Sequence, residues 1–279
     1  MRRAGVVDSA RGLGPHDHVC WSYDDPAEFV ARSVEFLAEG LELGQRVCYV
    51  GAGSVEGLIG DLAGLPGGGE ALRDGSLQVM SLDERYRTTE AVVPAQQVRA
   101  YAEATEAALA DGFGGLRVAA DVTALVRSAA QLDAFCAYEP LVNRYTATRP
   151  YSALCGYDRR ELGADVIAEL ACLHPVASAG ASPFWLYAES DDSMVLGGEL
   201  DFRGRELLPA ALGRTRPRPG GDLVVDVADL TFTDHHGLFT LSDFARRDGG
   251  SLTLRGLRSG PARLLGLLGI ADVRVEARR

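Results

Sequence analysis

The sequence contains no lysine, and all 28 of its basic residues are arginine. Chemistry that depends on a lysine amine is therefore excluded, both a Schiff base with a carbonyl substrate and the lysine of a phosphate-binding loop. The five cysteines do not have the spacing of a disulfide framework or of a C-x-x-C motif, because they lie far apart in the sequence. We therefore expect reduced thiols at Cys20, Cys48, Cys136, Cys155 and Cys172.

Positive charge is also scarce. The formal net charge of −11 argues against nonspecific binding to nucleic acid, because such binding needs basic patches. Residues 1–180 hold 15 arginines against 25 acidic residues, whereas residues 181–279 hold 13 and 14, so the acidity belongs to the first part. No apolar run approaches the ~20 residues of a membrane span, and no apolar segment follows the first three residues as in a secretory signal. We therefore expect a cytoplasmic protein.

Strand-like and helix-like segments alternate from residue 14 to residue 176. The predicted strands cover residues 18–23, 46–51, 76–82, 116–122 and 151–157, with helical periodicity between them. This alternation predicts a parallel α/β sheet covered by helices on both faces. Residues 1–13 are predicted to be a loose leader, residues 177–183 a linker rich in small residues, and residues 184–279 a second, smaller α/β domain.

One turn in the second domain joins the end of an apolar strand, residues 222–227, to a helix predicted at residues 238–247. Its sequence is Leu230-Thr231-Phe232-Thr233-Asp234-His235-His236-Gly237-Leu238. Asp234 is suited to cap the helix, because its carboxylate can accept from the first backbone N–H groups. The partial positive charge of a helix start favours an anion or a binding partner at this turn.

Residues 184–279 resemble the STAS family, the domain of bacterial anti-sigma-factor antagonists. The resemblance rests on an ordered set of motifs: Gly198-Glu199-Leu200-Asp201, the strand Leu223 to Asp226 with Leu230-Thr231-Phe232, the turn Asp234…Gly237-Leu238, Gly249-Gly250-Ser251-Leu252, and Leu264-Leu265…Leu268-Gly269-Ile270. It implies a small sheet-and-helix sandwich that docks on an anti-sigma factor or GHKL-type kinase. The implied partner-binding residues are Asp234, His235, His236, Gly237 and Leu238.

The same resemblance implies a switch that this turn lacks. In the STAS family the turn usually reads Asp-Ser-Ser-Gly, and the partner kinase phosphorylates the serine before the glycine. His235 and His236 stand at the two serine positions, so phosphorylation of a serine there is chemically impossible. Thr233 is a poor substitute because it precedes the cap. Phosphohistidine and a pH-sensitive contact remain open, but we favour a docking surface that has lost its phosphorylation site.

Residues 14–176 resemble the MEDS sensory domain of prokaryotic signalling proteins. The matching residues are His18-Val19-Cys20 with Tyr23, Phe36-Leu37-Ala38-Glu39-Gly40-Leu41, Gly44-Gln45-Arg46-Val47, Gly114-Gly115-Leu116-Arg117-Val118, Glu139, Leu154-Cys155-Gly156-Tyr157-Asp158-Arg159, and Glu169-Leu170 with His174-Pro175. The resemblance implies a RecA-like core and the sensing of small molecules, which are proposed to include simple hydrocarbon derivatives.

Parallel sheets bind ligands beyond the carboxyl ends of their strands, and several of these residues fall at or near such ends. We predict ligand binding by His18, Cys20, Tyr23, Cys155, Tyr157 and Asp158. His16, His18 and Cys20 also have the spacing that puts three side chains on one face of a strand, which with Cys155 or His174 would permit a metal site. The alternative is a neutral histidine beside a buried free cysteine, and from the sequence we assign neither a metal ligand nor a cofactor.

No enzymatic motif is complete. Gly51-Ala52-Gly53-Ser54 lies where a phosphate-binding loop would, but no G-K-[ST] follows it. Asp121 and Glu139 could form a carboxylate pair, although nothing in their spacing brings them together, and no G-x-S-x-G elbow occurs. The sequence therefore predicts a non-enzymatic signalling protein that senses a small molecule through its first domain and binds an anti-sigma factor through its second, affecting transcription. The alternative is a first domain that processes a nucleotide or small molecule under control of the second, and a third hypothesis is an inert scaffold or dimeriser.

Overall fold

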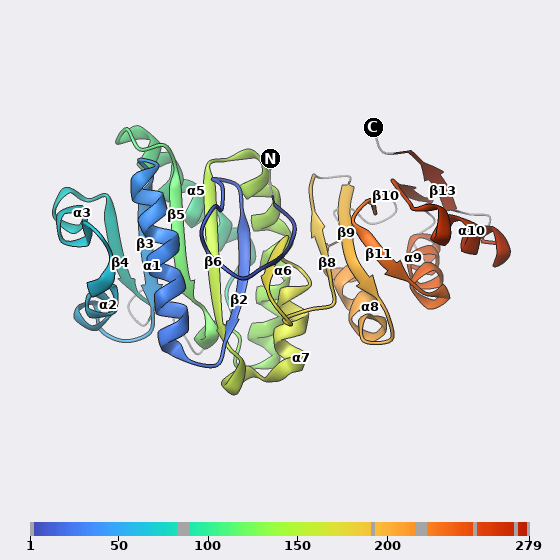
Figure 1. Ribbon diagram of the computed structural model, residues 1–279, viewed down its shortest axis with the longest axis horizontal. Helices are drawn as coiled ribbons and strands as arrows, with labels where there is room; N and C mark the ends of the chain where they lie inside the picture. Colours follow the sequence, from blue (N-terminus) through green and yellow to red (C-terminus); the bar gives the residue numbers. More distant parts are fainter. Residues whose placement is uncertain are drawn as a thin grey trace.

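The computed structural model describes residues 3–82, 90–190, 193–215, 222–247, 250–270 and 273–277. Within these ranges the chain forms two α/β units, each built on its own sheet, which lie side by side along the long axis of the molecule (Figure 1). The predicted fold class is confirmed: a parallel seven-stranded sheet flanked by helices is joined to a smaller mixed sheet. Among the described residues, no helix combines the length and hydropathy needed to cross a membrane.

The first sheet has the strand order β1-β7-β2-β6-β5-β3-β4, and all its neighbouring strands are parallel. Each of the five strands predicted from the sequence occurs in it, within one or two residues at each end. The strands are β1 (Gly5–Val7), β2 (His18–Tyr23), β3 (Arg46–Gly51), β4 (Leu77–Ser81), β5 (Leu116–Asp121), β6 (Tyr151–Asp158) and β7 (Val176–Ser178).

Helices cover both faces of this sheet, as parallel strands require. One face carries α1 (Pro26–Glu42), α2 (Val55–Asp61), the short 3-10 turn η1 (Leu62–Gly64) and α3 (Gly68–Asp74). The other carries α5 (Pro94–Ala110), α6 (Ala129–Thr148) and α7 (Arg159–Ala171), with the 3-10 turn η2 (Thr123–Leu125) before α6 (Figure 1). The faces alternate along β2, where Val19, Trp21 and Tyr23 join the core under α1 and Cys20 joins the core under α6 and α7.

The second sheet is centred on β9, which pairs antiparallel with β8 on one side and parallel with β10 and β11 on the other. β10 continues in parallel to β12 and β13. The strands are β8 (Phe184–Ala188), β9 (Ser193–Leu200), β10 (Leu223–Asp226), β11 (Leu230–Thr233), β12 (Leu252–Arg255) and β13 (Val273–Glu276); the helices are α8 (Gly204–Thr215), α9 (His235–Arg247) and α10 (Ser259–Leu267).

Three segments differ from their predicted structure. β1 lies within the predicted leader and pairs with β7, so Gly5–Val7 is part of the sheet rather than loose chain. β7 takes two residues of the predicted linker, which leaves 179–183 as the connection. Helix α9 starts at His235, three residues earlier than predicted, because Asp234 caps it there. Met1, Arg2 and Gly249, which belonged to the predicted leader and to a STAS motif, lie outside the described residues.

The two units are joined by packing as well as by the connection. Arg214 of α8 pairs with Glu169 of α7 at 2.8 Å and with Asp133 of α6 at 3.1 Å. The backbone N–H of Leu186 in β8 donates to the carbonyl of Cys172 at 2.6 Å, and the buried side chains on the α6 and α7 side continue into the core of the second unit. The second sheet is therefore fixed against α6 and α7 and does not hang from a free linker.

Candidate functional site

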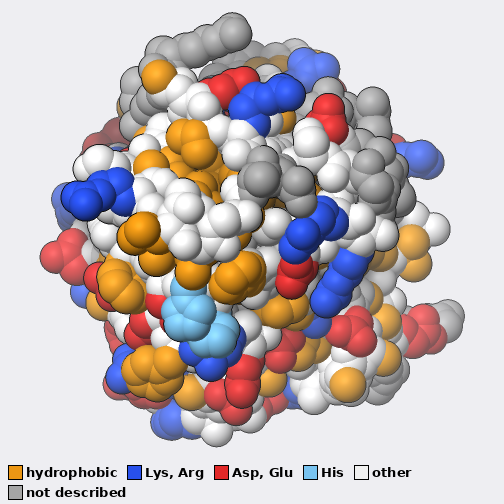
Figure 2. Space-filling model, turned by 90° about the vertical axis from the view of Figure 1, so that its right-hand side faces the viewer, with side chains coloured by type: hydrophobic (Ala, Val, Ile, Leu, Met, Phe, Trp, Pro, Cys, Tyr) orange, Lys and Arg blue, Asp and Glu red, His pale blue; other side chains and the backbone are white. Residues whose placement is uncertain are grey.

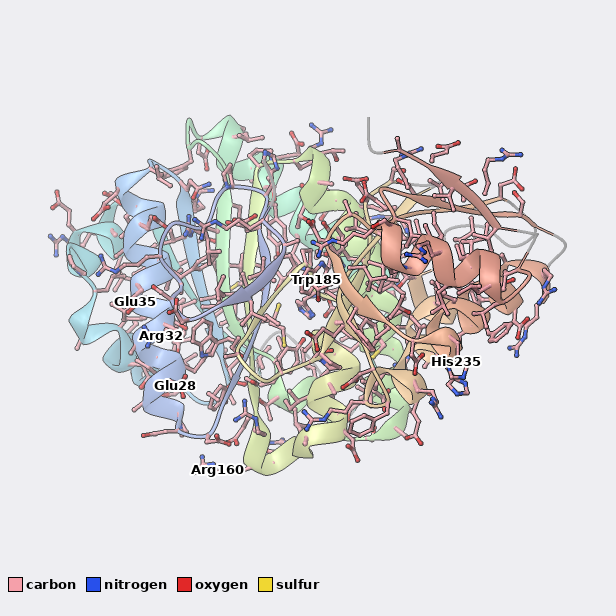
Figure 3. The ribbon with its side chains drawn as sticks, turned by 45° about the vertical axis from the view of Figure 1, so that its right-hand side comes forward. Glu28, Arg32, Glu35, Arg160, Trp185 and His235 are labelled. Atoms are coloured by element: carbon pink, nitrogen blue, oxygen red, sulfur yellow. The ribbon has the colours of Figure 1, made fainter. Side chains whose placement is uncertain are left out.

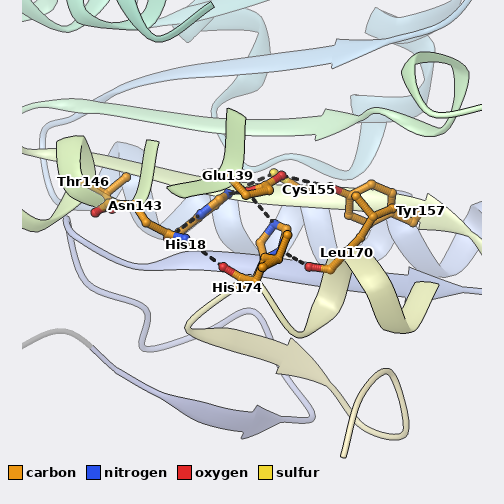
Figure 4. A network of polar contacts seen from close by, with 9 residues as sticks. His18, Glu139, Asn143, Thr146, Cys155, Tyr157, Leu170 and His174 are labelled. Carbon is orange, nitrogen blue, oxygen red and sulfur yellow. Dashed lines mark hydrogen bonds and ion pairs between the residues drawn. The ribbon is translucent and has the colours of Figure 1, made fainter. Parts of the chain in front are cut away.

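A fully buried polar cluster lies between the first sheet and helices α6 and α7 (Figure 4). His18 is the first residue of β2, and Cys155 lies in the neighbouring strand β6. Glu139 and Asn143 are four residues apart in α6 and so project from the same helix face. His174 follows the C-terminus of α7, just before β7. Four separate parts of the fold thus bring five polar side chains into one core.

The reactive atoms of this cluster converge on one point. The Nε2 atoms of His18 and His174 lie 3.6 and 3.5 Å from Oε2 of Glu139. The Sγ atom of Cys155 lies 3.4 Å from Nε2 of His18. The two imidazole ring centroids are 4.3 Å apart. Both histidines and Glu139 are 0 % exposed and Cys155 is 6 % exposed, so the cluster is shielded from solvent.

The hydrogen bonds on the far side of each ring fix the histidine tautomers. Nδ1 of His174 donates to the carbonyl of Leu170 at 2.9 Å, because a carbonyl oxygen can only accept. Asn143 donates through Nδ2 to the carbonyl of Leu173 at 2.7 Å, which turns its Oδ1 toward Nδ1 of His18 at 3.0 Å. Both Nδ1 atoms therefore carry a proton, and both Nε2 atoms face Glu139.

Burial decides the charge of the acidic groups. It raises the pKa of Glu139 well above its ordinary value, against the smaller opposing effect of the Tyr157 hydroxyl, which donates to Oε1 at 3.5 Å. Burial, and after it the charge of Glu139, raises the pKa of the Cys155 thiol and of the Tyr157 phenol. Without a cation the cluster therefore holds a neutral acid, thiol and phenol, because isolated buried charges are costly.

The six residues predicted to bind a ligand do not form one site. His18, Cys155 and Tyr157 belong to the cluster. Cys20 is buried opposite Cys155 in the strand register, and burial raises the pKa of its thiol. The other two lie elsewhere. Tyr23 faces α1, where its ring stacks on Phe29 at 5.4 Å and its hydroxyl donates to Asp121 at 2.7 Å.

Asp158 lies at the end of β6 and has a structural task. Its carboxylate accepts from the backbone N–H of Arg160 at 2.9 Å, which caps α7. Its other oxygen pairs with the Arg160 side chain at 3.1 Å. The hydrogen bonds to Arg160 lower the pKa of Asp158 despite the opposing desolvation. Asp158 is therefore a helix cap and not part of the cluster.

Sequence reasoning missed how the cluster is completed. Glu139 was considered with Asp121, but Asp121 bonds Tyr23 while Glu139 faces the two histidines. His16 was considered with His18, yet it precedes β2 and its Nδ1 lies 2.8 Å from the carbonyl of Thr146. The signals that could have found the cluster are the Glu139 and Asn143 spacing of four and the histidine that follows α7.

The Gly-rich turn after β3 is an ordinary helix start. The Ser54 hydroxyl accepts from the backbone N–H of Gly57 at 3.2 Å and caps α2, a helix of seven residues. Gly53 has a φ of +97°, which a residue with a side chain rarely adopts. The turn thus has a structural explanation that needs no phosphate.

The turn before α9 lies at the surface of the second unit. The Asp234 carboxylate accepts from the backbone N–H of Gly237 at 3.0 Å, so the predicted cap is present. A Cβ atom at Gly237 would lie 2.5 Å from Oγ1 of Thr233, which explains why glycine stands there. The ring centroids of His235 and His236 are 4.0 Å apart, and His235 points away from the body of the molecule (Figure 3).

Exposed aromatic side chains accompany these histidines. Phe202 is 72 % exposed, Phe232 48 % and Phe239 37 %. The His235 and Phe239 rings are 6.5 Å apart, and the backbone N–H of Asp234 bonds the carbonyl of Leu200, which places the end of β9 beside the turn. We call Phe202, Phe232, His235, His236 and Phe239 the turn patch. Figure 2 shows the pale-blue histidines bordered by hydrophobic side chains on this face.

Two hollows adjoin these sites. A cavity of about 20 Å³ lies next to Cys155 under α5 and α6, lined mainly by apolar side chains that include Val118, Ala120, Phe135 and Tyr138. A groove of about 700 Å³ runs between the two units, lined by α7, residues 180–183 and α8. The cavity is of the size that holds one or a few heavy atoms, whereas the groove is open to larger molecules.

Comparison with known protein families identifies the family of the first unit. The family model described as MEDS, the MEthanogen/methylotroph, DcmR Sensory domain, matches residues 17–175, more than half of the chain. The chain belongs to the MEDS family. All residues of the buried cluster lie within the matched range. No curated protein matches the chain.

The MEDS chain was also compared with solved structures. One similar structure is the crystal structure of the DUF1998 helicase MrfA bound to DNA and AMPPNP, with 9 % sequence identity and a TM-score of 0.31. The comparison covers 94 % of this chain but only 39 % of the helicase chain. At that TM-score the likeness carries no argument about fold or function.

Proposed function

We propose that this MEDS protein is a non-enzymatic cytoplasmic signalling protein. Its first unit senses a small molecule, and its second unit, a STAS-like domain, docks on an anti-sigma factor or GHKL-type kinase and so affects transcription. The sensing part is carried by the MEDS match over residues 17–175. The docking part is carried by the turn patch, an exposed aromatic surface at a capped helix start.

The size and lining of the cavity next to Cys155 favour a very small, largely apolar ligand. A molecule of one or a few heavy atoms fills such a space by displacing at most a water, and a small apolar group gains from the surrounding side chains. This supports the class of simple hydrocarbon derivatives that the family resemblance implies. Larger ligands fit the groove between the units instead.

The turn patch has the composition of a docking surface. Aromatic side chains supply most of the binding energy in protein interfaces, and exposed phenylalanines clustered on one face of a soluble unit indicate a partner. The two adjacent imidazole rings of His235 and His236 extend this surface. Because the serine switch is absent, partner binding is either constitutive or controlled from the first unit.

The docking proposal is tested by affinity capture from a lysate of the source organism with full-length protein as bait. We expect wild type to capture an anti-sigma factor or GHKL-type kinase, identified by mass spectrometry. Phe202→Asp places a charge in the turn patch and should abolish capture. Leu267→Asp is the matched control, because Leu267 is also an exposed apolar residue of this unit, 83 % exposed on α10. Capture of no such protein, or equal capture by both variants, would refute the proposal.

A further inference from the structure

The buried cluster of the first unit has the composition of a metal-binding site. Its donor atoms are Nε2 of His18, Nε2 of His174, Sγ of Cys155 and Oε2 of Glu139. Imidazole nitrogen, thiolate sulfur and carboxylate oxygen are the ligands that zinc takes in proteins. The side-chain ligand atoms of His18, Cys155 and His174 all lie within 4.8 Å of one another.

Three of the six distances among these atoms can be compared with the edges of a tetrahedron. Metal distances of about 2.0–2.1 Å for nitrogen and oxygen and about 2.3 Å for sulfur give edges of about 3.3 Å between N and O and about 3.6 Å between N and S. The Nε2–Oε2 distances here are 3.6 and 3.5 Å, and the Nε2–Sγ distance is 3.4 Å. All three distances lie close to the corresponding edge, and the Nε2 atoms of both histidines face the same Oε2 of Glu139.

Three of the four proposed ligands also form a hydrogen bond on the side away from the shared site. Nδ1 of His18 bonds Asn143, Nδ1 of His174 bonds the carbonyl of Leu170, and Oε1 of Glu139 accepts from Tyr157. Such bonds orient the ring nitrogen or carboxylate oxygen that faces the metal, and they are a regular feature of metal sites. A histidine pair that only filled a core would not need both Nδ1 atoms tied while both Nε2 atoms face one carboxylate.

Charge balance favours a divalent ion. Two neutral imidazoles, one thiolate and one carboxylate carry a total charge of −2, which a divalent cation cancels inside a core where uncompensated charge is expensive. We therefore propose that His18, His174, Cys155 and Glu139 bind one divalent transition-metal ion of the zinc class. The inference concerns the first unit alone and does not rest on the proposed function.

Binding follows a simple balance. The ion displaces the thiol proton of Cys155 and the carboxylic proton of Glu139, so one ion enters and two protons leave to solvent. No electron is transferred, and no other reactant is needed. Because the four ligands come from β2, β6, α6 and the segment between α7 and β7, the ion would tie the strands to the helices that also contact the second unit.

The test uses full-length protein, stripped with a chelator and reconstituted anaerobically with Zn²⁺ or Co²⁺ before desalting. We expect close to one equivalent of retained metal by elemental analysis and two protons released per Zn²⁺ in a weakly buffered indicator titration. The Co²⁺ form should show a near-ultraviolet thiolate-to-cobalt charge-transfer band and intense visible bands of a tetrahedral site. Retention of less than a tenth of an equivalent by wild type would overturn the proposal, and the cluster would then be a neutral hydrogen-bonded core.

Variants locate the ion. Cys155→Ser should remove the charge-transfer band, whereas Cys48→Ser, which alters another buried thiol on the same face of the sheet, should keep it. A band that survives Cys155→Ser would overturn the assignment. If circular dichroism shows that Cys155→Ser is unfolded, the conservative variant Tyr157→Phe tests the site instead. It loses the hydrogen bond to Glu139, which should weaken metal affinity roughly 10- to 100-fold. An unchanged affinity in chelator competition would contradict the proposed geometry.

Discussion

A buried arginine explains part of the MEDS sequence pattern and gives a sharp stability prediction. Arg117 of β5 is 0 % exposed, and its Nη2 donates to Glu39 of α1 at 2.6 Å. Its Nη1 donates to the carbonyl of Leu13 at 3.1 Å, and the guanidinium lies 4.0 Å from the ring centroid of Phe36. A Cβ atom at Gly40 would lie 2.7 Å from Cδ of Arg117. Two matching motifs therefore hold α1 on the sheet, on the face opposite the buried cluster.

The perturbation is Glu39→Ala, which leaves the arginine charge buried without its carboxylate. Breaking a fully buried pair from one side costs about 3–5 kcal/mol. The Glu39 side chain is 25 % exposed, so water can reach the vacated place, and we expect about 3 kcal/mol. Arg117→Met removes the charge itself and retains apolar bulk, so it should cost about 1–2 kcal/mol. In the Arg117→Met background, Glu39→Ala should then cost less than about 1 kcal/mol.

The assay is urea unfolding of the full chain followed by circular dichroism, with an unchanged slope showing that only stability has changed. Glu35→Ala is the matched control, because Glu35 lies on the same helix and pairs at 2.7 Å with Arg32, whose side chain is 29 % exposed. Both side chains are labelled on α1 (Figure 3). We expect the control to change stability by less than about 1 kcal/mol. The reasoning fails if Glu39→Ala costs no more than the control, or costs the same with and without Arg117.

Three further predictions follow from single contacts. Burial raises the pKa of Cys136 to about 12, so near pH 8 only roughly one Cys136 thiol in 10⁴ is ionised. Mass spectrometry should therefore find iodoacetamide on Cys136 only after unfolding. Rapid labelling of Cys136 in the folded protein would contradict this. Arg214→Ala removes the ion pairs to Glu169 and Asp133. It should lower the free energy of unfolding by only about 1 kcal/mol, because these groups are partly solvated, but it should speed proteolysis at residues 179–183. An unchanged cleavage rate would argue against a packed interface between the two units. Gly237→Ala should destabilise the second unit by about 1–3 kcal/mol, because the added methyl group would clash with the Thr233 hydroxyl. Thermal unfolding measures this change. A variant as stable as wild type would show that the turn can relax.

The layers of the fold could be predicted because they follow local patterns. Apolar strands of five to eight residues, separated by capped helices such as α1 with Asp25 and Pro26 at its start, predict a parallel sheet without any tertiary information. β1 and β7 were missed because each has only three residues, too few to show alternation. Their stability comes from pairing with each other and with β2, which is a tertiary effect.

The site could be predicted only in part, for a related reason. His18 and Cys155 lie in strands whose registers can be inferred, but the side of the sheet that each side chain faces depends on the exact strand start. A one-residue difference separates Ser22 from Tyr23, and the two side chains face opposite cores. Glu139 and His174 come from a helix and a turn whose orientation relative to the sheet is set by packing, so the spacing of Glu139 and Asn143 predicts a shared helix face but not that this face meets His18.

The structure of the turn before α9 bears on where regulation can enter under the proposed function. A switch that phosphorylates a hydroxyl beside the two histidines needs that hydroxyl to be accessible, and the nearest one along the chain is that of Thr233. That side chain is only 6 % exposed, its hydroxyl donates to the Asp234 carbonyl at 3.1 Å, and it lies against Gly237. A kinase could not reach it without unfolding the start of α9. A signal from the first unit has a direct path to the second. His174 of the buried cluster lies two residues after Cys172, whose carbonyl accepts a hydrogen bond from the backbone N–H of Leu186 in β8. Control of the turn patch is therefore expected to pass through α7 and β8 and not through phosphate on Thr233.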